Sequence, residues 1–167
     1  MRFHSKTAAL CRAATVGALY VALTWFSSLL GLANGPVQLR LAEALCVLPF
    51  FMPETIFGLT VGCFLSNILV CGGVWADVLF GTLATLIGAL GTYAMHSLRG
   101  KLRFLCVLPP ILANSVIVPF VLKYAYGFGD GWFLLAAGVA AGEILSVGVL
   151  GSFLMLALEK RPFWRNK

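Results

Sequence analysis

Charge is scarce in this chain. Only 11% of its 167 residues are Asp, Glu, Lys or Arg, whereas soluble domains carry about 25%. A water-soluble fold with so few charges could not cover its surface. Hydrophobic residues make up 60% of the sequence, and lipid is the natural solvent for such a chain. The composition excludes an ordinary soluble domain and predicts an integral membrane protein.

Catalytic and metal-binding signatures are also missing. The chain has two histidines and five scattered cysteines without a C-x-x-C pair, which argues against a zinc site or a disulfide framework. The sequence contains no H-E-x-x-H, no G-x-S-x-G and no G-x-x-x-x-G-K-[ST] phosphate loop, so the chain does not hydrolyse ATP by that mechanism. We expect no enzymatic activity, no metal and no cofactor in this chain.

What the sequence does contain is a series of apolar stretches, at residues 13–32, 41–52, 56–71, 76–96, 104–122 and 132–158. A helix needs about 20 residues to cross the hydrocarbon core, and the first, fourth, fifth and sixth stretches meet or nearly meet that length. The second and third are short and are interrupted by Pro49 and Pro53. They form short tilted helices or a re-entrant pair.

No soluble domain or linker is predicted outside these stretches. The first stretch has 20 residues, more than the apolar region of about 7–15 residues in a signal peptide, so we interpret it as a permanent span. The sequence therefore predicts an all-α, multi-pass membrane protein. It has six transmembrane helices and a single membrane-embedded domain over residues 1–167.

The basic residues indicate the orientation in the membrane. If the N-terminus is cytoplasmic, the inner segments carry ten of the twelve Lys and Arg residues, and the outer loops carry only Arg40 and Lys123. Positive-inside sorting produces this bias. We predict that both termini are cytoplasmic. The net charge of +6 reflects this topology and does not indicate nucleic-acid binding.

Small residues recur every four positions in several stretches. Gly58-x-x-x-Gly62 and Gly138-x-x-x-Gly142 allow helices to approach closely, and we expect them to serve packing inside the protein. The first stretch has a ladder of alanines, and this face is the better candidate for contact with another subunit. The ladder and its neighbours are Ala9, Ala13, Ala14, Ala18 and Ala22.

Polar side chains within the apolar stretches are the candidates for function, because an ionised group in lipid costs at least about 2.5 kcal/mol. In the predicted topology the three carboxylates among them fall in the outer half of the membrane, and Asn114 lies deeper. The six candidates are Arg40, Glu43, Asn67, Asp77, Asn114 and Glu143. They form either an outward-facing polar pocket or a set of bonds between helices that includes an Arg40–Glu43 pair, since these two share a helix face. Aromatic residues, including Trp75 and Trp132, surround the outer end.

The sequence resembles the QueT family over nearly its whole length. The resemblance depends most on R-L-A-E-A-L at 40–45 and D-V-L-F-G-T-L-A-T at 77–85. Further matching segments are A-L-Y-V-A-L-T at 18–24, L-P-P at 108–110 with Asn114, and the pair Gly142-Glu143.

The resemblance implies a function that spacing alone does not. Members of the family resemble substrate-binding S components of energy-coupling factor (ECF) importers in the bacterial cell membrane. They take up queuosine precursors, which are 7-deazaguanines such as preq1 or queuine. A transmembrane coupling subunit and two ATPase subunits complete such importers, and ATP is used by those partners. The alanine pattern of the first helix meets the coupling subunit.

A binding site follows from the chemistry of a 7-deazaguanine. One carboxylate can accept two adjacent N–H donors with charge-assisted strength, and either Glu143 or Glu43 would have this role. Asp77 would neutralise the aminomethyl cation of preq1. Arg40, Asn67 and Asn114 would supply the remaining donors, and a tryptophan, Trp75 or Trp132, would stack on the ring.

Other functions remain open at this point. The chain could be an S component for another vitamin or nucleobase, or a stand-alone carrier or channel that needs no ATPase. A membrane enzyme is disfavoured by the missing motifs. A scaffold without a ligand is the fourth alternative.

Overall fold

The computed structural model describes residues 6–32, 38–70, 72–127, 129 and 131–160. Over these residues the secondary structure is helical, as predicted, and contains no strand. The elements are α1 (Lys6–Leu29), η1 (Leu41–Phe50), α2 (Thr55–Leu69), η2 (Asp77–Gly81), α3 (Thr82–Ala94), η3 (Gly100–Val107), α4 (Leu108–Tyr124), α5 (Trp132–Glu143), η4 (Ile144–Gly151) and α6 (Ser152–Glu159). The segments η1 and η3 are 3-10 helices, and η2 and η4 are π-helices.

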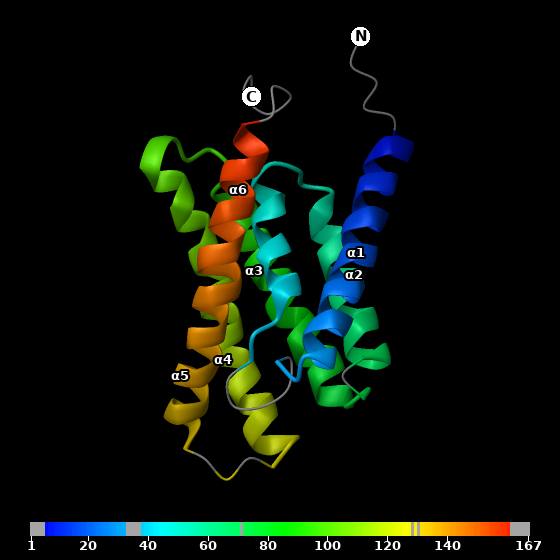
Figure 1. The fold of residues 1–167 in the computed structure, drawn as a ribbon, viewed down its shortest axis with the longest axis vertical. Helices are drawn as coiled ribbons and strands as arrows, with labels where there is room; N and C mark the ends of the chain where they lie inside the picture. The colour runs from blue at the N-terminus through cyan, green and yellow to red at the C-terminus, as the bar shows by residue number, and fades with distance from the viewer. Residues whose placement is uncertain (1–5, 33–37, 71, 128, 130, 161–167) are drawn as a thin grey trace.

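The lengths of the helical segments follow the apolar stretches. Among the described residues, four segments are long and apolar enough to cross a membrane: Lys6–Leu29, Asp77–Ala94, Gly100–Tyr124 and Trp132–Glu159. The second and third stretches form shorter helices, η1 and α2. Successive segments run in opposite directions between the two ends of the molecule, and η1 lies in the middle (Figure 1). Continuous helix satisfies the backbone hydrogen bonds internally, as lipid requires.

The two ends of the molecule differ in charge. The start of α1, the η1–α2 turn, η3 and the end of α6 lie at one end (Figure 1), which we call the basic end. Arg12 pairs there with Glu54 at 2.5 Å, and Arg103 Nη2 lies 2.8 Å from Glu159 Oε2. The basic residues of these segments are the ones predicted to lie on the cytoplasmic side.

The glycines of α2 bring it into close contact with α1. A Cβ atom on Gly58 would lie 2.2 Å from the carbonyl oxygen of Ala13, and one on Gly62 would lie 2.8 Å from that of Gly17. The Gly58–Gly62 motif therefore serves internal packing, as predicted. Gly142 is equally constrained, because its Cβ would lie 1.8 Å from the carbonyl oxygen of Gln38.

The close contact with α2 determines which alanines of α1 face outward. Ala13 is buried and Ala9 is half-buried. The other three, Ala14, Ala18 and Ala22, are exposed. The ladder on the outer face of α1 therefore consists of these three residues.

The outer surface of the bundle is apolar. In the apolar windows of the four long segments, only 22–39% of the residues are buried inside the protein. Large side chains such as Phe133 and Leu112 are 83% and 61% exposed. Such a continuous apolar surface is typical of a protein that lies in lipid.

Candidate functional site

All six polar residues singled out in the sequence are buried in the structure, and none is more than 7% exposed. They come from the start of η1, from α2, η2, α4 and α5. We call this set the polar cluster: Arg40, Glu43, Asn67, Asp77, Asn114 and Glu143.

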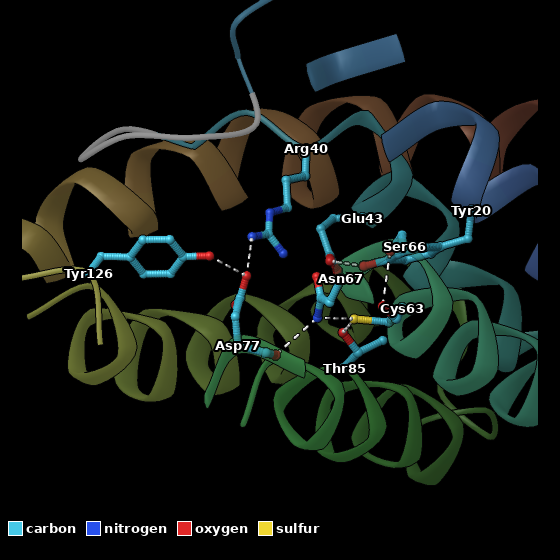
Figure 2. A network of polar contacts seen from close by, with 9 residues as sticks. All are labelled: Tyr20, Arg40, Glu43, Cys63, Ser66, Asn67, Asp77, Thr85 and Tyr126. Atoms are coloured by element: carbon cyan, nitrogen blue, oxygen red, sulfur yellow. Dashed lines mark hydrogen bonds and ion pairs between the residues drawn. The ribbon is translucent and has the colours of Figure 1, made fainter. Parts of the chain in front are cut away.

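Asp77 joins two segments that are distant in sequence. Its Oδ2 lies 3.6 Å from Arg40 Nη2 and accepts a hydrogen bond from the Tyr126 hydroxyl at 3.2 Å (Figure 2). Arg40 immediately precedes η1 and has an extended backbone, so the rule for residues on one helix face does not apply to it. Asp77 thereby fastens the segment before η1 and the segment after α4 to the start of η2.

Glu43 is held by groups of α1 and η1. One oxygen, Oε1, accepts a hydrogen bond from the Tyr20 hydroxyl. The other, Oε2, accepts one from the Cys46 thiol at 3.1 Å. With a donor on each oxygen, the buried carboxylate has the compensation that burial requires.

Asn67 ties α2 to η2 and α3. Its Nδ2 donates to the backbone oxygen of Asp77 at 3.0 Å and contacts Cys63 Sγ at 3.6 Å. Thr85 donates to the same sulfur at 3.2 Å (Figure 2). A Cβ atom on Gly81 would lie 3.0 Å from Asn67 Nδ2, so the glycine leaves room for the amide.

Glu143 and Asn114 complete the cluster from α5 and α4. Glu143 is within electrostatic reach of Asn114, Glu43 and Arg40. Glu143 Oε2 and Asn114 Nδ2 are both buried without a hydrogen-bond partner. The six residues are therefore linked through neighbouring contacts rather than spread around the bundle.

The two tryptophans lie differently from the cluster. Trp75 is 70% exposed and lines a hollow of about 790 Å³ beside α4, with Phe80 and Phe120 among its neighbours. Trp132 is half-buried, and its ring contacts Phe120 and Phe133, with centroids 5.5 and 5.2 Å away. Trp75 therefore faces the outside in this structure, and Trp132 belongs to an aromatic group at the start of α5.

Several side chains that hold the cluster were not singled out from the sequence. They are Tyr20, Cys46, Cys63, Thr85 and Tyr126. A signal existed for one of them: Tyr20 is followed by Thr24 and Ser27, spaced by four and three residues, which is one helix face. All three are buried. This polar stripe in an apolar run could have predicted that α1 contributes to the cluster.

The arrangement is suited to recognition of a polar molecule. Carboxylates, amides and a guanidinium gather in an apolar bundle, where their hydrogen bonds are stronger than in water. Within the part of the chain that the structure describes, no group of three or more His, Cys, Asp or Glu side chains could hold a metal ion.

Comparison with known proteins identifies the family of this chain. The family model of the QueT transporter matches residues 10–160. A relative from Lactococcus lactis subsp. cremoris (strain MG1363), named queuosine precursor transporter QueT, is 31% identical over 164 residues, which cover 94% of this chain and 95% of the relative. No solved structure matches the chain.

Proposed function

The chain belongs to the QueT transporter family, and from this we propose that it is the substrate-binding membrane subunit of an ECF-type importer for a queuosine precursor. The family and the relative are transporters and not enzymes. The proposed substrate is a 7-deazaguanine such as preq1 or queuine, and the proposed location is the bacterial cell membrane.

We propose a single domain over residues 1–167 with six crossings and both termini in the cytoplasm. The alternating direction of the helical segments supports this topology (Figure 1). So does the position of the basic residues in segments that meet at one end, because positively charged segments stay on the cytoplasmic side. The polar cluster then lies toward the outer surface, from which an importer receives its substrate.

The single observation that carries the proposal is the buried polar cluster. Three carboxylates, two amides and one guanidinium are each at most 7% exposed, in a bundle whose outer surface is apolar. Ionisable groups inside a membrane are costly, and proteins retain them where they bind a substrate or ion. A cluster that only bridged helices would not need an unpartnered acceptor and donor such as those of Glu143 and Asn114.

A 7-deazaguanine matches this set of groups. Its ring carries adjacent N–H donors beside a carbonyl, and a carboxylate accepts such donors with charge-assisted strength. In this proposal Glu143 or Glu43 binds the donors. Asp77 neutralises the aminomethyl cation of preq1, and Arg40, Asn67 and Asn114 are the remaining polar contacts. Trp132 or Trp75 would have to turn toward the site to stack on the ring.

Energy for import comes from partners in this proposal. ATP is used by two ATPase subunits, and a coupling subunit contacts α1. The exposed ladder Ala14, Ala18 and Ala22 supports this contact, since small side chains let another helix approach closely. No cofactor is proposed for this chain.

The proposal is tested by ligand identification. The purified chain in detergent is analysed by mass spectrometry for a retained ligand, and then titrated with preq1, queuine, guanine and thiamine. We expect binding of a 7-deazaguanine and a rise in the unfolding temperature, because a ligand that binds only the folded state raises the apparent stability. Binding of thiamine alone would indicate another S component. Uptake by cells that lack the ATPase subunits would indicate a stand-alone carrier.

A further inference from the structure

The three buried carboxylates differ in how their oxygens are engaged. Both oxygens of Glu43 accept protein donors, from Tyr20 and from Cys46. Asp77 Oδ2 accepts a hydrogen bond from the Tyr126 hydroxyl and forms an ion pair with the Arg40 guanidinium. Glu143 alone of these three has a buried oxygen, Oε2, without a hydrogen-bond partner. An unsatisfied buried acceptor lowers the stability of the folded protein, so its presence indicates a function that retains it.

A matching donor lies on the neighbouring helix. Asn114 on α4 is 4% exposed and is within electrostatic reach of the Glu143 carboxyl, and its Nδ2 has no hydrogen-bond partner. The α4–α5 side of the cluster thus presents one buried acceptor and one buried donor that no hydrogen bond satisfies. Such a pair is complementary to an N–H beside a C=O, which is the lactam edge of a guanine-like ring.

The backbone around both residues is irregular. Pro119 lies inside α4 and has no N–H, so the carbonyl of Ser115, next to Asn114, lacks its normal helical partner. The π segment η4 begins at Ile144, directly after Glu143. Turns of this kind occur frequently at functional sites. Irregular backbone inside a membrane is tolerated only where protein or a polar cavity shields it.

We propose that Glu143 and Asn114 are the pair that recognises the substrate edge. Glu143 Oε2 accepts the ring N–H, and Asn114 Nδ2 donates to the adjacent C=O of a lactam heterocycle. Glu43 is a positioning residue that holds α1 against η1 and does not touch this edge. The inference depends on the proposed function and deepens it, because the sequence left Glu143 and Glu43 as equal candidates.

The test compares two edges on the purified full chain in lipid nanodiscs. Preq1 has N–H beside C=O, whereas 7-deazaadenine has a ring nitrogen acceptor beside an amino group. Glu143→Gln and Asn114→Asp should each lower preq1 affinity by about tenfold or more, the loss expected for a charged or mismatched hydrogen bond. Both should reduce the affinity ratio of preq1 to 7-deazaadenine.

Two controls separate recognition from folding. Glu43→Gln should lower the unfolding temperature of the ligand-free protein but keep the preference for preq1 over 7-deazaadenine. Glu159→Gln, at the basic end, should leave the affinity and the ratio unchanged. If either Glu143→Gln or Asn114→Asp does not fold, the other variant still tests the proposal, because each removes one hydrogen-bond partner of the lactam edge.

The outcomes distinguish the two proposals. A wild-type chain that binds preq1, with a ratio unchanged by Glu143→Gln and Asn114→Asp, overturns the recognition pair and leaves the proposed function intact. If Glu43→Gln alone removes the preference for preq1 over 7-deazaadenine, Glu43 binds the lactam edge, and the proposed recognition by Glu143 and Asn114 is overturned. A wild-type chain that binds neither preq1 nor queuine overturns the proposed function, and the inference with it.

Discussion

At the scale of single residues, the Tyr20–Glu43 hydrogen bond connects the inner face of α1 to the polar cluster. Tyr20 is 1% exposed and Glu43 is 2% exposed, so water cannot replace either partner. The same helix presents Ala18 and Ala22 outward. One face of α1 is therefore part of the cluster, while its other face is the surface proposed for the coupling subunit.

Tyr20→Phe should destabilise the protein, because the substitution removes the donor to a buried carboxylate oxygen. The expected loss is about 1–3 kcal/mol, the cost of leaving a buried polar group unsatisfied. Thermal unfolding in detergent measures it. Tyr93→Phe is the matched control, since Tyr93 is 37% exposed. Equal unfolding temperatures for the two variants would show that the hydrogen bond contributes little.

The membership of the cluster could be predicted from the sequence better than its pairing. Arg40, Asp77 and Glu143 are conspicuous because charge is rare and lies within or beside apolar runs. Which partner each one takes depends on the relative rotation and depth of helices, which a single sequence does not encode locally. Arg40 pairs with Asp77 across the bundle, and the thiol of Cys46 donates to Glu43.

At the scale of helical elements, glycines determine how closely the segments approach. The backbone oxygen of Gln38 occupies the space that a side chain on Gly142 would need. This contact holds the segment before η1 against α5, and it thereby brings Arg40 near Glu143. The Gly142-Glu143 pair in the sequence thus combines a packing residue with a polar residue of the cluster.

Gly142→Ala should therefore displace the segment that carries Arg40. Overpacking of this kind costs about 1–3 kcal/mol, and we expect lower thermal stability together with weaker preq1 binding. Gly131→Ala is the control, because a Cβ atom there meets nothing within 4 Å. Unchanged binding by Gly142→Ala would mean that the 38–40 segment does not position the cluster.

The outer face of α1 gives a prediction about assembly. Ala18→Trp places a large ring on an exposed position, so it should leave ligand binding intact and prevent co-purification with the coupling subunit. Leu112→Trp, on the exposed face of α4, is the control and should co-purify normally. Co-purification of Ala18→Trp at the wild-type level would exclude this face as the contact surface.

The alanine ladder illustrates what sequence periodicity leaves open for an element. Ala9 and Ala13 repeat at the same spacing as Ala14, Ala18 and Ala22, and nothing in the spacing separates the two rows. The structure separates them, because Gly58 packs on the backbone of Ala13. The 3-10 and π segments were likewise not predicted, since their residues follow the same apolar pattern as an α-helix.

For the whole molecule, the number and length of apolar stretches predicted the helical architecture well. The lipid constraint makes this possible, because any apolar segment in a membrane must satisfy its own backbone. The short second and third stretches were recognised as short from the sequence, and they form η1 and α2. The central position of η1 depends on contacts between distant segments and could not be predicted.

The proposed orientation can be measured by labelling with a membrane-impermeant maleimide in intact cells. Gly129→Cys, in the connection between α4 and α5, should react from outside. Ser97→Cys, between α3 and η3, should react only after the membrane is permeabilised. Both are made in a Cys11→Ser/Cys71→Ser background to remove the exposed thiol of Cys11 and the thiol of Cys71. The reverse pattern of labelling would contradict cytoplasmic termini.

Within η4, the number of residues matters as much as their identity. Each residue advances an α-helix by about 100°, and a π segment holds one residue more per turn than regular helix. Deleting one residue from Ile144–Gly151 would therefore convert a π turn into a regular α turn and leave Trp132–Glu143 in phase with Ser152–Glu159, whereas inserting one residue would swing them by about 100° and carry the Glu143 carboxylate toward the acyl chains. A single insertion should therefore be tolerated in the connections of this protein but not here, where a single deletion is the smaller change.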